Sequence, residues 1–173
     1  LISGGLGTAG IALTKYDAGT LTLSSISNQN TALVRINGGT LAYGVADALL
    51  TPLVTVAGGT LDLKGFNETN LSTVTLIEGS IVNTGGAATL TSTQTYVFES
   101  GTVSAVINSA IAGGIAKNTA GKVIISGDNT FTSTSIAVNA GYLNLRHNNA
   151  RGAAGTSLTT TISAGATMEL ENG

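Results

Sequence analysis

The chain has 173 residues, of which 9% are charged, 4% are aromatic and 24 are glycine, and its formal net charge is −2. Its few basic side chains are scattered, so the sequence lacks the basic patch that binds nucleic acid. The absence of cysteine excludes disulfide bonds and thiolate metal sites. No apolar run reaches the roughly 18 residues of a membrane-spanning helix. Because the chain begins at Leu1 and not at methionine, we expect a processed or excised piece.

A glycine followed by alternating apolar residues recurs at steps of about twenty residues. Alternation with a period of two is the pattern of a β-strand with one buried face, and it does not make the stripe of an amphipathic helix. We therefore expect a strand after each glycine and almost no helix. In chain order the segments are Gly19–Leu23 (GTLTL), Gly39–Tyr43 (GTLAY), Gly59–Leu63 (GTLDL), Gly79–Asn83 (GSIVN), Gly101–Ala105 (GTVSA), Gly121–Ile125 (GKVII), Gly141–Leu145 (GYLNL) and Gly165–Leu170 (GATMEL).

A second apolar pair lies five and three positions before most of these glycines. Each unit therefore predicts two strands that flank a glycine corner, where a backbone with positive φ has no steric cost. The pairs are Val34 and Ile36, Val54 and Val56, Val74 and Leu76, Tyr96 and Phe98, and Ile136 and Val138.

The pattern breaks at four places, for which a bulge or an inward ladder of amides is a possible cause. A single polar residue occupies one inward slot, two pairs are not apolar, and the last pair needs a one-residue shift. These positions are Asn83, the pair Ala116 and Asn118, the pair Thr14 and Tyr16, and the pair Met168 and Leu170.

The repeat predicts an all-β fold, a right-handed parallel β-helix of about eight coils of roughly 20 residues. Stacking the coils about 4.8 Å apart would pair each strand with its equivalent in the next coil and give a rod of roughly 40 Å. We expect residues 1–173 to form one domain that is a segment of a longer repeat array.

The segment Lys117–Leu145 (KNTAGKVIISGDNTFTSTSIAVNAGYLNL) resembles the autotransporter-associated β-strand repeat of bacterial surface proteins. That repeat has a lysine, a glycine-led strand, an S-G-x-N-T motif and a V-x-x-G-x-L motif, and the stretches from Leu13 and Val138 are similar to it. Ser133 and Thr134 depart from it, as do Asn118, Thr119 and Arg151. The resemblance implies an extracellular passenger region on a Gram-negative-type cell surface, where the β-helix acts as a stalk.

Enzymes with this fold act on polysaccharides through clustered carboxylates. The best candidate pair is Glu78 with Glu99, just before consecutive corners, with Asp62 and Glu68 one coil earlier. No basic residue accompanies them, so we expect a solvated edge. His147 is the only histidine, which excludes a His-based metal site, and the aspartates lack the period of a calcium-binding β-roll.

Two further patterns favour structural interpretations. Gly5, Gly7 and Gly10 match G-x-G-x-x-G, but without a strand-turn-helix context they predict a corner of the first coil. Outward hydroxyls after successive corners should stack into a ladder. Ice binding by such a ladder would need a second ordered column, and the residues two positions further on are irregular. The ladder residues are Thr20, Thr40, Thr60, Ser80 and Thr102.

We therefore expect a non-catalytic structural or adhesive module and assign no catalytic, cofactor-binding or metal-binding residue. The alternative is a polysaccharide-degrading β-helix enzyme that uses Glu78 and Glu99. Candidate partners are a surface glycan, a receptor on a host or neighbouring cell, and the chain itself, because an uncovered β-edge can take up another chain end to end. We expect no nucleic acid and no cofactor.

Overall fold

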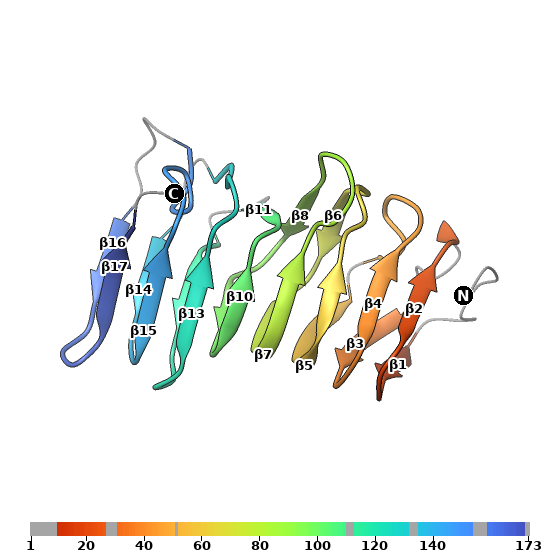
Figure 1. Ribbon diagram of the computed structural model, residues 1–173, viewed down its shortest axis with the longest axis horizontal. Helices are drawn as coiled ribbons and strands as arrows, with labels where there is room; N and C mark the ends of the chain where they lie inside the picture. The colour runs from red at the N-terminus through yellow and green to blue at the C-terminus, as the bar shows by residue number, and fades with distance from the viewer. Residues whose placement is uncertain are drawn as a thin grey trace.

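The computed structural model describes residues 10–26, 31–50, 52–109, 113–131, 135–153 and 159–171. Gly5 and Gly7 of the first predicted corner lie outside these ranges. The described ranges hold β-strands and no α-helix, and the strands pair in parallel. Figure 1 shows these strands stacked side by side from β1 at one end to β17 at the other.

Three columns of strands form the walls of the stack. The front column of Figure 1 contains β2 (Thr20–Leu23), β4 (Thr40–Tyr43), the end of β5 (Leu53–Asp62), the end of β7 (Val74–Val82), β10 (Gly101–Val103), β13 (Lys122–Ile125), β15 (Tyr142–Leu145) and β17 (Thr167–Leu170). The lower column contains β1 (Ile11–Lys15), β3 (Thr31–Ile36), the beginnings of β5 and β7, β9 (Tyr96–Phe98), β12 (Ile115–Lys117), β14 (Ser135–Val138) and β16 (Thr159–Ile162). A short back column contains β6 (Glu68–Leu71), β8 (Thr89–Ser92) and β11 (Val106–Ser109).

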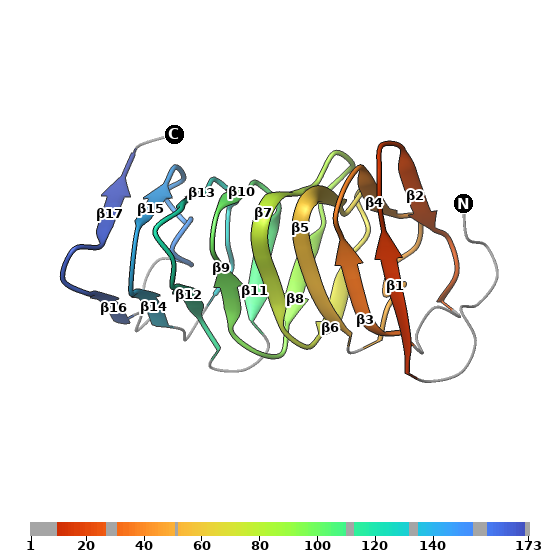
Figure 2. The same ribbon diagram turned by 90° about the horizontal axis from the view of Figure 1, so that it is seen from below.

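The chain winds as a parallel β-solenoid of about seven turns. Each coil runs along the lower column, turns a corner, rises through the front column and returns along the back, as the two views in Figures 1 and 2 show. Seen from the N-terminal end, this path turns clockwise as it recedes, which is the right-handed sense. The predicted parallel β-helix is therefore confirmed, with about seven turns for the eight coils expected.

The inward side chains of the lower and front columns form one continuous hydrophobic core. Val34, Ile36, Leu41 and Leu61 are fully buried, and so are their counterparts in the later coils as far as β14 and β15. An aromatic cluster fills the middle, where the Tyr96 ring lies 5.5 Å from Phe98 and 6.3 Å from Phe131 between ring centroids.

The corner glycines have both conformational and steric reasons to be glycine. Gly79 and Gly101 have φ values of 107° and 119°. A Cβ on Gly79 would overlap the carbonyl oxygen of Gly59, and a Cβ on Gly101 would overlap that of Gly79. At these two corners the coils stack too closely for any side chain, which explains why glycine recurs there.

Two of the predicted inward pairs are wrong by one residue. Lys15 pairs with Ile36, and Lys117 pairs with Val138, so these lysines occupy the inward column in place of Tyr16 and Asn118. In these two coils the corner between the lower and the front column is therefore one residue longer than in most other coils. The alternation remains intact, with Leu13 and Ile115 as the preceding inward residues of the two coils.

The front column also shifts in register between two coils. Val103 pairs with Ile125 and not with Val123, so Gly101 lies level with Val123. The glycine-to-glycine alignment of the sequence is therefore off by two residues at this step. At the C-terminal end, Met168 and Leu170 pair with Leu143 and Leu145 as expected.

Candidate functional site

The two carboxylates of the candidate pair have different surroundings. Glu78 is exposed on β7, and Glu99 follows β9 with one carboxylate oxygen buried and without a hydrogen-bond partner. The sequence predicted no basic residue beside this pair, but the charge of Glu99 acts on the Lys117 ammonium. Burial lowers the pKa of Lys117, and Glu99 opposes this shift only in part. No hydrogen bond or ion pair in the described part of the chain joins Glu78 to Glu99.

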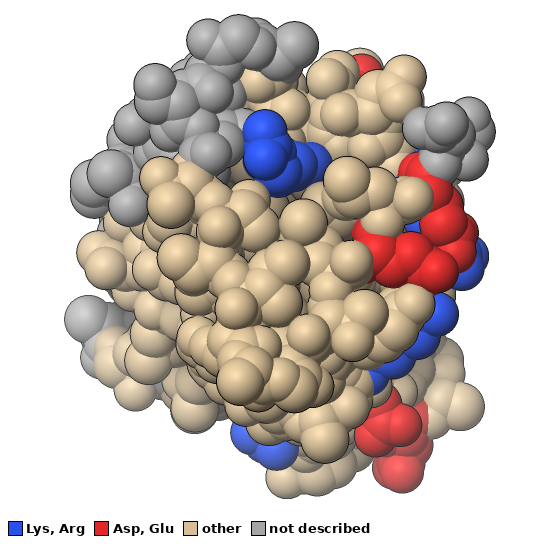
Figure 3. Space-filling model, turned by 90° about the vertical axis from the view of Figure 1, so that its left-hand side faces the viewer, with Lys and Arg blue, Asp and Glu red and all other residues tan. Residues whose placement is uncertain are grey.

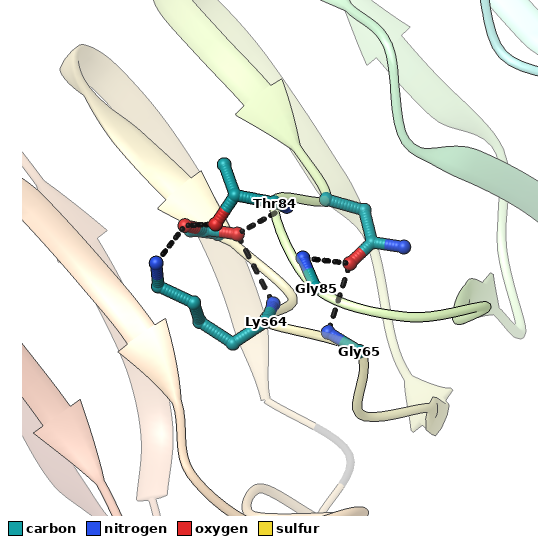
Figure 4. Close-up of polar contacts among 6 residues, drawn as sticks. Lys64, Gly65, Thr84 and Gly85 are labelled. Atoms are coloured by element: carbon teal, nitrogen blue, oxygen red, sulfur yellow. Dashed lines mark hydrogen bonds and ion pairs between the residues drawn. The ribbon is translucent and has the colours of Figure 1, made fainter.

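Asp62 holds two turns of neighbouring coils together (Figure 4). Its carboxylate accepts hydrogen bonds from Lys64 N and Thr84 N, both at 3.0 Å, and from Thr84 Oγ1 at 2.7 Å. The Lys64 ammonium lies 3.4 Å from the same carboxylate. Burial raises the pKa of Asp62, but the hydrogen bonds and this cation outweigh it, and the pKa is lowered. Because four groups already bind this carboxylate, we assign Asp62 a structural role.

Asn83 lies beside Asp62 and fixes the same pair of turns. Its Oδ1 accepts hydrogen bonds from Gly65 N at 2.8 Å and from Gly85 N at 3.3 Å (Figure 4). Its Nδ2 donates to Gly86 O at 2.7 Å. The irregularity predicted at Asn83 is thus a turn clamp, and an amide suits it because it both donates and accepts.

Glu68 on β6 is fully buried, and the sequence pattern missed it as a core residue. Leu49 N donates to its Oε2 at 3.2 Å, while its Oε1 has no hydrogen-bond partner. Burial, with a smaller contribution from the charge of Asp47, raises its pKa to about 8 against the opposing effect of hydrogen bonds from the backbone of Leu49 and Ala48. The buried Tyr43 hydroxyl also lacks a hydrogen-bond partner. The pKa of Tyr43 is raised mainly by burial and to a smaller extent by the charge of Glu68. Glu68 is therefore a proton-binding group inside the core.

The two inward lysines cap the long corners. The stem of Lys117 is buried in the core, and its ammonium donates to the carbonyl oxygen of Thr119. Lys15 caps its corner in the same way. Its ammonium donates to Asp17 O at 2.7 Å and lies 3.3 Å from Gly38 O of the next coil. Sequence reasoning missed this arrangement, and a lysine four positions before a corner glycine is the signal that could have indicated it.

Asn129 joins three coils where the back column has no further described strand. It is fully buried, and its Oδ1 accepts from Ile107 N at 2.9 Å while its Nδ2 donates to Ala150 O at 2.8 Å. Asn129 is the asparagine of the S-G-x-N-T motif. The motif therefore supplies an amide that bridges the coils before and after it.

A polar cluster covers the front column near its C-terminal end. The Lys122 ammonium lies 4.8 Å from the centre of the Tyr142 ring. A hydrogen bond to Glu169 raises the pKa of Tyr142 and lowers the pKa of Glu169. Asn144 donates to Glu169, and Arg146 Nε donates to Asn144 Oδ1 at 2.6 Å. These contacts link adjacent coils on their outer surface.

His147 lies in the turn after β15. Its Nδ1 is 3.6 Å from Asp128 Oδ1 and accepts a hydrogen bond from Asn149 N at 3.1 Å. Together with Arg151 and Met168 it lines a cavity of about 190 Å³ at the C-terminal end of the stack. No group of three His, Cys, Asp or Glu side chains among the described residues could hold a metal ion.

The predicted hydroxyl ladder is present over five coils. Thr20, Thr40, Thr60, Ser80 and Thr102 pair in register, and the Ser80 and Thr102 hydroxyls lie 3.0 Å apart. It ends there because Thr102 next pairs with Ile124.

The described ranges contain no helix long and apolar enough to cross a membrane. Comparison of the chain with protein-family models, curated proteins and solved structures gave no match.

Proposed function

We propose that this chain is a non-catalytic structural module, a β-solenoid stalk of an extracellular, cell-surface protein of the autotransporter-passenger type. The observation that carries the proposal is the unbroken parallel pairing from β1 to β17. Such a stack is a rod whose length grows with each coil while its cross-section stays constant. A rod of this kind suits a protein that holds other parts of itself away from a surface.

The use of the polar side chains supports this function. Asp62, Lys117 and Asn129 are buried, and each is engaged with backbone groups of turns or neighbouring coils. Lys117 and Asn129 are also residues on which the resemblance to the autotransporter-associated repeat rests. Their structural roles explain why the motif contains these residue types. This supports the proposal that the chain belongs to a protein of the bacterial cell surface.

An adhesive contact with a surface glycan or a receptor belongs to the same proposal. The outer face of the front column offers hydroxyl and charged groups, among them Thr102, Lys122 and Glu169. Such groups can donate hydrogen bonds to saccharide hydroxyls and accept hydrogen bonds from them. A glycan array probed with the purified chain tests this part separately.

The main test is a cleavage assay. We expect the purified chain to leave a panel of acidic polysaccharides intact, measured by release of reducing ends and by absorbance of unsaturated products. Cleavage of any of them would overturn the proposal and favour the alternative enzyme. Glu78→Gln combined with Glu99→Gln would then show whether these carboxylates are responsible, with Glu171→Gln as the control for loss of an exposed charge.

A further inference from the structure

Asn37 lies at the corner between β3 and β4, directly after the inward side chain of Ile36. Within the described ranges, Asn37–Gly38 is the one step in which a glycine follows an asparagine. Both residues are half-buried, so solvent reaches them. The main-chain nitrogen after an asparagine can attack the side-chain amide, and glycine favours this attack because it has no Cβ to hinder the approach. The corner is therefore a candidate site for a reaction of the chain with itself.

Arg35 activates the side-chain amide of Asn37. Its Nε donates a hydrogen bond to Asn37 Oδ1 at 2.8 Å. Attack on the amide carbon places negative charge on this oxygen, and a donor that is already fixed beside it stabilises the transition state. The contact also turns Oδ1, and not the departing Nδ2 group, toward the arginine.

A second cation lies next to the attacking nitrogen. The ammonium of Lys15, from the preceding coil, lies 3.3 Å from Gly38 O. The Gly38 N–H donates to no group of the described chain, so no hydrogen bond holds this nitrogen away from the amide. The nitrogen must lose its proton to attack, and a nearby cation favours the anion that results.

Positive charge is concentrated at this corner. The whole chain has 7 lysine and arginine residues. Figure 3 views the end that holds β17 and shows a few basic and acidic groups on a mostly uncharged surface. In the described chain neither Lys15 nor Arg35 forms an ion pair. These two cations therefore favour a product that carries negative charge at residue 37.

We propose that Asn37 deamidates spontaneously in the folded chain, with Gly38 N as the nucleophile and Arg35 as the donor to the amide oxygen. Gly38 N bonds to Asn37 Cγ, and its proton passes to solvent. The amide nitrogen takes up a proton and leaves as ammonia, which closes a succinimide ring. Water then adds to the ring and opens it to aspartate or isoaspartate. This modification is independent of the structural function proposed above.

The two products would change the corner in different ways. The aspartate product keeps the length of the main chain and places a carboxylate against Arg35, which turns the present hydrogen bond into an ion pair. The isoaspartate product lengthens the main chain at a corner with little space, where a Cβ on Gly59 would already lie 2.9 Å from Gly39 O. Either product adds a negative charge beside the two cations.

Two other asparagines are matched controls for this site. Asn139 holds the equivalent corner position in a later coil, where its N–H donates to the carbonyl of the inward lysine one coil earlier, but an alanine follows it. Asn144 accepts a hydrogen bond from Arg146 Nε at 2.6 Å, as Asn37 does from Arg35, but a leucine follows it. Both amides should therefore persist in the folded chain.

The first test follows the mass of residue 37 in the full chain during incubation at mildly alkaline pH in water labelled with heavy oxygen. Trypsin then releases residues 36–64, in which Asn37 is the only side-chain amide. We expect this peptide to gain the mass of deamidation together with the label, which excludes a reaction during digestion. The peptide of residues 123–146, which contains both control asparagines, should keep its mass.

The unfolded chain supplies the contrary outcome. If residue 37 stays an asparagine in the folded chain but is converted in the chain unfolded in urea, the corner protects the amide and the proposal is wrong. Conversion of Asn139 or Asn144 at the rate of Asn37 would also overturn it, because the glycine and the two cations would then have no effect.

Two substitutions test the groups that carry the reaction, with circular dichroism to show that each variant folds. Gly38→Ala adds a Cβ next to the attacking nitrogen and should slow the conversion at least about tenfold. Arg35→Met keeps the stem but removes the donor, and should slow the conversion about tenfold in the folded chain and not in urea. Arg146→Met, with fragment ions locating the change in each peptide, should leave the rate at Asn37 unchanged. Equal rates in the folded Arg35→Met variant and the unmodified chain would refute activation by the arginine.

Discussion

The buried carboxyl of Glu68 should make the stability of the solenoid fall as the pH rises. Its pKa is raised from 4.5 to about 8 in the folded chain. Between these values the folded state binds a proton that the unfolded state has released, so the free energy of unfolding decreases by about 1.4 kcal/mol per pH unit. The contribution is fully present below pH 4.5 and is lost by about pH 8, a total of roughly 5 kcal/mol.

Glu68→Gln removes this titration and keeps a side chain of nearly the same shape. Its carbonyl oxygen can still accept from Leu49 N. We expect the variant to gain about 3–5 kcal/mol at pH 8.5 and to differ by less than about 1 kcal/mol at pH 4.5. Urea unfolding followed by circular dichroism at several pH values measures both figures.

Glu78→Gln is the matched control, because it removes an exposed carboxylate from a neighbouring strand. It should keep the slope of the unmodified chain between pH 5 and pH 8. If Glu68→Gln shows that same slope, the proton is not bound by Glu68 in the core, and the reasoning from burial is wrong. The lowered pKa of Asp62 does not interfere, since its stabilising effect is lost only at acid pH.

Three further substitutions test the devices that hold the coils together, each by the midpoint of urea unfolding. Lys117→Met keeps the buried stem but removes the ammonium that caps the corner, and should cost about 1–2 kcal/mol. Asn129→Ala leaves one buried N–H and one buried carbonyl without partners and creates a cavity, so we expect a loss of about 3–4 kcal/mol. Gly79→Ala forces a Cβ onto a corner with positive φ against a backbone oxygen, and should cost more than about 2 kcal/mol.

Exposed positions of the same residue types provide the controls. Lys122→Met and Asn139→Ala lie on the outer surface and should change the free energy of unfolding by less than about 1 kcal/mol. Equal effects of Lys117→Met and Lys122→Met would show that burial of the lysine stem and its cap are unimportant. If Asn129→Ala were as mild as Asn139→Ala, the bridge between coils would not carry the stability assigned to it.

The sequence by itself determined the coil, its glycine corner and most of its core. Period-two alternation fixes which side chains face inward, and pairs such as Val34 and Ile36 repeat it from coil to coil. Because equivalent strands stack in parallel, a repeat of about twenty residues leads directly to a solenoid. The hydroxyl ladder followed from the same rule, since outward positions stack whenever inward positions do.

Only the tertiary structure decided the register of single coils and the roles of the buried polar groups. Lys117 in an inward slot is invisible to a pattern of apolar pairs, because its stem packs like an aliphatic side chain while its ammonium reaches the corner carbonyls. Glu68, Asn129 and Asp62 likewise depend on partners from other coils, about twenty residues away. A local sequence pattern records which residues alternate, but the burial of a polar atom depends on the neighbours that stacking provides.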